Sequence, residues 1–167
     1  QMQAIATEFN YSETTCVLPP VGQGNDAHVR IFTVRYEVPF AGHPNVGTAF
    51  VLATQAARPP ARLRFEEKAG LVLVEILVEQ GQATGAELTA PQPLKRMPQI
   101  SVEHAAACLS LLPGEVKTDR HPPQIISVGL AFLAVELTSR DALRRAMPDA
   151  VAFANTLPCD GSDAIYL

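Results

Sequence analysis

Hydrophobic and polar positions follow two different periods along the chain, and each period predicts a type of element. The first ten residues carry apolar side chains at helical spacing, at Met2, Ile5, Ala6 and Phe9. They predict an amphipathic helix that ends near Asn10. Alternating or short β-rich apolar runs, bounded by proline and glycine, then predict a series of strands. These expected strands span residues 12–18, 28–33, 62–68, 71–79 and 87–90.

A different pattern occupies residues 44–55. The stretch VGTAFVLA within it has no charged residue on any face, and Pro44 suits the first position of a helix because it has no N–H to leave unpaired. We therefore expect a helix that is buried on every side, with Val46, Phe50 and Leu52 nearly inaccessible. Strand-forming segments lie on both sides of it in the sequence, which predicts an α+β fold in which a mixed or antiparallel sheet wraps around a central buried helix.

The pattern after residue 100 predicts the start of a second α/β unit. Ser101 is expected to cap a helix through Leu111, and a polar linker is expected at 115–123. Strands are expected at 125–128 and 132–137, then a helix capped by Thr138 or Ser139, and a last strand at 164–167. The expected division is therefore 1–100 for the first half and 101–167 for an incomplete second half.

Composition excludes several classes of protein. The 167 residues are 47% hydrophobic and carry a net charge of −4 without a basic stripe, which argues against nucleic-acid binding. No apolar run approaches the ~20 residues of a membrane span, so a cytoplasmic protein without a membrane partner is expected. The cysteines Cys16, Cys108 and Cys159 show no metal-ligand spacing and are expected to be reduced thiols. We expect neither a metal nor a cofactor.

Two positions could carry chemistry. The turn at Gly42 and His43 precedes the uncharged helix, whose free N–H groups would attract an anion, although a purely structural turn explains the pattern equally well. Glu13 stands beside the apolar residues Cys16 to Leu18, where partial burial would favour general acid/base use. Taken alone, Glu13 would be interpreted as a solvated carboxylate, because glutamate is seldom fully buried unless it is paired.

Several ordered blocks of the sequence resemble the phenazine biosynthesis PhzF-like family. The blocks are Asn10–Thr15 (NYSETT), Val17–Pro20 (VLPP), Arg30–Thr33 (RIFT), Glu37–Pro44 (EVPFAGHP), Gly47–Ala49 (GTA), Ser127–Leu133 (SVGLAFL) and Ser139–Leu143 (SRDAL). The resemblance implies the diaminopimelate-epimerase-like fold, in which two similar halves each wrap a sheet around a central helix. Relative to the family pattern, the opening strand and the glycine-rich loop of the second half are missing, so both ends are expected to be incomplete.

The resemblance also implies an activity and a set of site residues. It implies an isomerase of a small carboxylate that needs no cofactor and forms a homodimer, with Glu13 as the acid/base and His43 as its polar partner. Gly42, Pro44 and Asn45 are the expected substrate-binding residues. A binding or scaffold protein that keeps the fold is the alternative. An epimerase or racemase is the weaker one, because Ala41 stands where related racemases carry cysteine.

Overall fold

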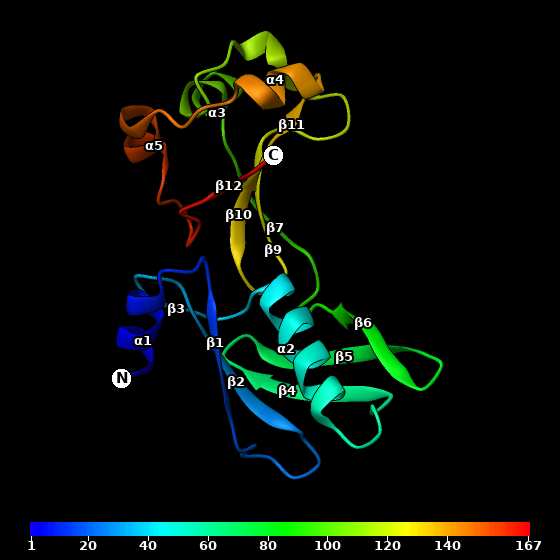
Figure 1. The fold of residues 1–167 in the computed structure, drawn as a ribbon. Coiled ribbons are helices and arrows are strands. Elements are labelled where there is room, and N and C mark those ends of the chain that lie inside the picture. The colour runs from blue at the N-terminus through cyan, green and yellow to red at the C-terminus, as the bar shows by residue number, and fades with distance from the viewer. The chain divides into compact units, whose positions relative to one another are not determined.

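The computed structural model describes residues 1–167, which form two compact units, Gln1–Pro93 and Leu94–Leu167 (Figure 1). The first unit begins with α1 (Met2–Phe9), which ends at Asn10 in the left-handed conformation typical of a helix C-terminus. Its backbone then enters the sheet through β1 (Thr14–Leu18). The helix and strand expected at this end of the chain are therefore both present.

A mixed sheet of six strands makes up most of the first unit. Its strands are β1, β2 (Ala27–Phe32), β3 (Glu37–Val38), β4 (Arg62–Glu67), β5 (Gly70–Glu79) and β6 (Gln82–Thr89). The order is β1-β2-β4-β5-β6, with β3 paired to β2. All pairs are antiparallel except β2 and β4, which run parallel because the chain crosses between them through a helix. The α+β class with a mixed sheet is confirmed.

That crossing helix is α2 (Gly42–Gln55), which packs on β5, β6 and β1 (Figure 1). Its small residues Ala49 and Ala53 are fully buried, and they let the helix lie close to the sheet. The expectation of burial on every side is wrong in detail. Phe50 remains 37% exposed, and Val46 and Leu52 are only half-buried. The sheet covers one face of α2. The absence of charged residues therefore predicted an apolar helix correctly, but it did not predict how much of the helix surface is buried.

The helix also starts two residues earlier than its sequence suggested, so Pro44 is its third residue rather than its first. Proline is tolerated there because the N–H groups of the first turn have no partner within the helix. The residue before the helix is Ala41, which has an extended backbone. Its methyl side chain cannot cap the helix with a hydrogen bond.

The loop between β1 and β2 is fastened by one carboxylate. Glu66 on β4 accepts hydrogen bonds from the backbone N–H groups of Val21 and Gly22, at 2.8 and 2.6 Å, and from the Asn25 amide at 2.7 Å. A Cβ at Gly22 would lie 2.9 Å from Glu66 Oε1, so a larger residue would displace the carboxylate. These bonds lower the pKa of Glu66, the Asn25 bond contributing most.

The second unit contains two short sheets with helices beside them. Its strands are β7 (Lys95–Gln99), β8 (Val116–Lys117), β9 (Gln124–Ser127), β10 (Ala131–Ala134), β11 (Glu136–Leu137) and β12 (Ile165–Tyr166). Its helices are α3 (Val102–Cys108), the 3₁₀ helix η1 (Pro113–Glu115), α4 (Arg140–Arg145) and α5 (Ala150–Thr156). One sheet has the order β12-β10-β9-β7, and β8 pairs with β11.

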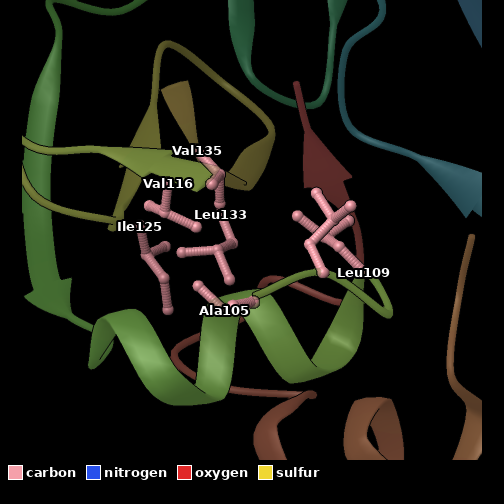
Figure 2. Close-up of a cluster of buried hydrophobic side chains, with 8 residues drawn as sticks. Ala105, Leu109, Val116, Ile125, Leu133 and Val135 are labelled. Carbon is pink, nitrogen blue, oxygen red and sulfur yellow. The ribbon is translucent and has the colours of Figure 1, made fainter. Parts of the chain in front are cut away.

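Apolar side chains from both sheets form the core of this unit (Figure 2). Ile125 on β9 and Leu133 on β10 are directly paired and fully buried, and they belong to the same cluster as Ala105 on α3. The expected caps are confirmed, because the side chains of Ser101 and Ser139 accept N–H bonds in the first turns of α3 and α4. The expected polar linker at 115–123 is wrong at its start, because Val116 is buried in the core and pairs with Leu137.

Candidate functional site

The fold brings together Glu13 and His43, which are thirty residues apart in the sequence. Glu13 directly precedes β1, and His43 is the second residue of α2. The Glu13 Oε2 atom lies 3.2 Å from His43 Nε2, at ion-pair distance, although the angle does not meet hydrogen-bond geometry. The Glu13 side chain is 21% exposed and the His43 side chain 76% exposed, so the pair lies where a half-buried carboxylate meets solvent.

A cavity of about 360 Å³ opens beside this pair. Its residues come from alternating positions in and just before β1 and from α2 between its second and eleventh residues. They are Glu13, Thr15, Val17, His43, Pro44, Gly47, Thr48, Val51 and Leu52. Both the β1 side and the α2 side of the cavity combine polar or titratable groups with aliphatic ones, the composition expected of a site for a small organic molecule.

Two hydroxyl groups link the walls of the cavity. The Thr48 Oγ1 atom on α2 donates a hydrogen bond to Thr15 Oγ1 on β1 at 2.9 Å. Thr48 is buried and Thr15 half-buried, so this bond holds helix and strand together next to the Glu13 and His43 pair. The neighbouring Thr14 hydroxyl is buried and has no partner.

The three residues expected to bind substrate have different environments. Pro44 lines the cavity, whereas Gly42 is exposed at the first position of α2 and does not line it. Asn45 is 0% exposed, and its Nδ2 donates to the Ala41 carbonyl at 2.9 Å. Its buried amide stabilises the start of α2, and the expected substrate-binding role of Asn45 stays a prediction.

Sequence reasoning missed most of the cavity wall, although the signal was present. Glu13, Thr15 and Val17 alternate along one strand, so they share a face. Pro44, Thr48 and Val51 recur at helical spacing and therefore share a face of α2. The register of a predicted strand and the face of a predicted helix would have grouped them once the two elements were known to be adjacent.

The structure shows neither a cluster of metal ligands nor a helix suited to a membrane. No group of three or more His, Cys, Asp or Glu side chains comes together to hold a metal ion. Cys16, Cys108 and Cys159 are free thiols. None of the helices combines the length and the hydrophobicity that crossing a bilayer requires.

A mixed sheet with a crossing helix, and a carboxylate and imidazole at the start of that helix, define an α+β protein of the epimerase-like fold class. Among solved structures, a protein from Pseudomonas aeruginosa described as a predicted epimerase matches with a TM-score of 0.76 and 25% identity over 93% of this chain. The hydroxyproline epimerase of Agrobacterium vitis, 15% identical with a TM-score of 0.54, shares the fold.

The chain belongs to the phenazine biosynthesis-like (PhzC-PhzF) protein family, whose sequence model matches residues 1–166. It is 36% identical over 162 residues to an uncharacterized isomerase of Mesorhizobium japonicum, and 36% identical over 155 residues to the trans-2,3-dihydro-3-hydroxyanthranilate isomerase of Pseudomonas fluorescens. A PhzF-family protein of Bacillus anthracis matches with a TM-score of 0.70 and 29% identity over 93% of this chain. The chain spans about half of these relatives, 52% of each.

Proposed function

We propose that the complete protein is a PhzF-like isomerase that moves a proton within a small carboxylate substrate by glutamate acid/base chemistry, without a cofactor. The observation that carries this proposal is the 3.2 Å approach of Glu13 Oε2 to His43 Nε2 at the edge of the cavity. The Glu13 carboxylate takes a proton from one carbon of the substrate and returns it to another. Atoms and charge balance within one molecule, so the reaction needs no oxidant or second substrate.

The surroundings of the pair support distinct roles for its members. Glu13 is the more buried partner, and proton transfer benefits from a group held away from bulk water. His43 is largely exposed, so its imidazole is free to hydrogen-bond the substrate while it orients Glu13. The free N–H groups at the start of α2, near Gly42, suit the substrate's anionic group.

The aliphatic part of the lining adds a condition on the substrate. Val17, Val51 and Leu52 line the cavity together with the polar groups, so the carboxylate should carry an apolar body. The relatives named as isomerases, including two proteins named trans-2,3-dihydro-3-hydroxyanthranilate isomerase from Pseudomonas fluorescens and Pseudomonas aeruginosa, support an isomerase as the reaction class. Thiol-based racemisation has no cysteine available at Ala41, the residue that precedes α2.

The proposal includes a cytoplasmic homodimer. Closed two-fold symmetry is the commonest arrangement of soluble oligomers. Light scattering of the complete protein should give twice the mass of one chain, and a monomeric mass at micromolar concentration would remove the dimer from the proposal.

The test of the proton transfer is a Glu13→Gln variant of the complete protein. Glutamine keeps the shape and hydrogen bonding of the side chain but cannot carry the proton, so turnover should fall by ~10²- to 10⁴-fold while the protein stays folded. Glu8→Gln is the matched control, because Glu8 is an exposed carboxylate on α1 that lies outside the cavity. A folded Glu13→Gln variant with full activity would refute Glu13 as the acid/base, whereas a folded wild-type protein without isomerase activity would favour a binding or scaffold protein.

A further inference from the structure

A second carboxyl group lies near the start of α2, and it is buried without a charged partner. Glu67 is the last residue of β4, and neither Oε1 nor Oε2 has a hydrogen-bond partner. The Asn45 Oδ1 atom is buried and unpartnered as well. Three orphaned polar atoms in one place would be costly, because each loses its hydration without a compensating bond.

The charged residues next to Glu67 are committed elsewhere. Lys68 donates to Glu37 at 2.7 Å, and Glu66 accepts from the loop at 21–25. Burial raises the pKa of Glu67 to about 7, and the Asn45 amide opposes this by a smaller amount. No charged side chain, including His43, contributes to this shift. The neighbour that acts on the Glu67 carboxyl is therefore a neutral amide.

We propose that Glu67 is held as a neutral carboxylic acid in a two-bond ring with the Asn45 amide, and that this ring positions the first turn of α2. In the ring, the Glu67 O–H donates to Asn45 Oδ1, and one Asn45 Nδ2 hydrogen donates to the other Glu67 oxygen. The second Nδ2 hydrogen already donates to the Ala41 carbonyl at 2.9 Å. A carboxylic acid and a primary amide match each other in this way, and a small reorientation gives all three orphaned atoms a partner.

The ring joins β4 to both sides of His43. Asn45 follows His43 by two residues, and Ala41 precedes it by two, so a single amide fixes the backbone on either side of the imidazole. Ionisation of Glu67 removes the O–H donor and places a charge beside Asn45 Oδ1, which opens the ring. Glu67 is thus a positioning residue for His43. Its catalytic consequence rests on the proposed function, whereas the ring itself does not.

The first experiment needs no variant and no substrate. In the complete protein labelled with ¹³C at glutamate carboxyls, the Glu67 signal should titrate with a midpoint near pH 7, well above the ~4.3 of an ordinary glutamate. The assignment comes from the signal that disappears in Glu67→Gln. A midpoint near 4.3 would overturn the proposal.

The second experiment tests the positioning of His43. In the wild-type protein, the NMR signals of the His43 ring should show a pH-dependent change whose midpoint equals that of Glu67. This component of the change should vanish in Glu67→Gln, because the glutamine amide can pair with Asn45 at every pH. A Glu66→Gln variant is the control and should keep it. His43 signals that do not respond at the Glu67 midpoint would refute the positioning role. If both the Glu13→Gln and the His43→Ala variants kept full activity, the proposed function would be refuted. The Glu67 titration and the His43 response to it would still be observed, so the two failures are distinguishable.

Discussion

The hydroxyls of Thr15 and Thr48 lie 2.9 Å apart, and their hydrogen bond joins β1 to α2 along the wall that also carries Glu13 and His43. The two acid/base candidates thus sit on two different elements, and a direct bond between those elements lies close by. The precision of the 3.2 Å approach between Glu13 and His43 therefore depends on how well this strand and helix are held together.

A Thr48→Val variant should lose this bond with little change in shape. The free energy of unfolding should fall by about 1 kcal/mol, because the Thr15 hydroxyl loses its partner while half-buried. The measurement is a double-mutant cycle with Thr15→Val in chemical denaturation, which should give a coupling of about 0.5 to 1.5 kcal/mol. Additive effects of the two substitutions would show that the hydroxyls do not interact.

A His43→Ala variant should affect binding more than chemistry. If the imidazole holds the substrate, KM should rise by ~10- to 100-fold, the equivalent of one charge-assisted hydrogen bond, with a smaller change in kcat. Steady-state kinetics of the complete protein gives both constants. A large fall in kcat at constant KM would assign His43 to the proton transfer itself.

Gly47 offers a substitution whose effects on stability and binding should oppose each other. It is an exposed residue within α2 that lines the cavity, and a Cβ there would meet no atom within 4 Å. Gly47→Ala should raise the free energy of unfolding by about 0.5 to 1 kcal/mol and weaken substrate binding by occupying space at the wall. Gly81→Ala is the matched control and should destabilise, because Gly81 has a φ of +81°.

Glu37 predicts how the first unit responds to acid. The Arg30 guanidinium, opposed by burial and assisted by Lys68, lowers the pKa of Glu37 to about 2. The native state binds this proton more weakly than the unfolded chain, so the stabilisation is complete above pH ~4.5 and is lost as the pH falls towards 2. Denaturation curves between pH 5 and 2 should show a shallower decline for Glu37→Gln than for the wild-type protein. Parallel curves would contradict the ion pair.

Chelation should leave the activity intact. The proposed proton transfer uses only a carboxylate and an imidazole, and no group of three potential metal ligands comes together in these residues. Turnover of the complete protein after dialysis against EDTA should equal that of the untreated protein. Activity that disappears on chelation and returns with a divalent ion would contradict the proposed mechanism.

The sequence predicted elements better than it predicted environments. Periodicity located α1, α2 and four strands of the first sheet because local spacing decides those elements. It reached only the end of β6 and did not predict the two-residue β3. The exposure of Phe50 was not predictable in this way, since it depends on where a curved sheet stops. β7 and α5 were missed, the first because prolines flank and interrupt it and the second because its seven residues carry too short a pattern.

The residues of the candidate site also differ in how far the sequence could predict them. Glu13 and His43 were expected from family resemblance, and the role of each remains a prediction. Thr15, Thr48 and Val17 required only the face of each element, which sequence patterns contain. The burial of Glu67 could not be predicted, because the sequence EEK is typical of an exposed hairpin end. Only the structure shows that the Glu67 carboxyl is buried next to Asn45.

The parallel pairing of β2 with β4 has a consequence for how this protein acquires its site. The two strands meet only at Ala27 with Phe65 and His28 with Glu66, and the whole of α2 lies in the chain between them. Forming this contact closes a loop of nearly forty residues, and the two residue pairs alone do not offset the chain entropy that is lost. Helix, parallel pair and sheet should therefore form in a single late step of folding, and Glu13 should meet His43 only then. The rate at which Glu13 and His43 come together during refolding should therefore equal the rate of the last folding step.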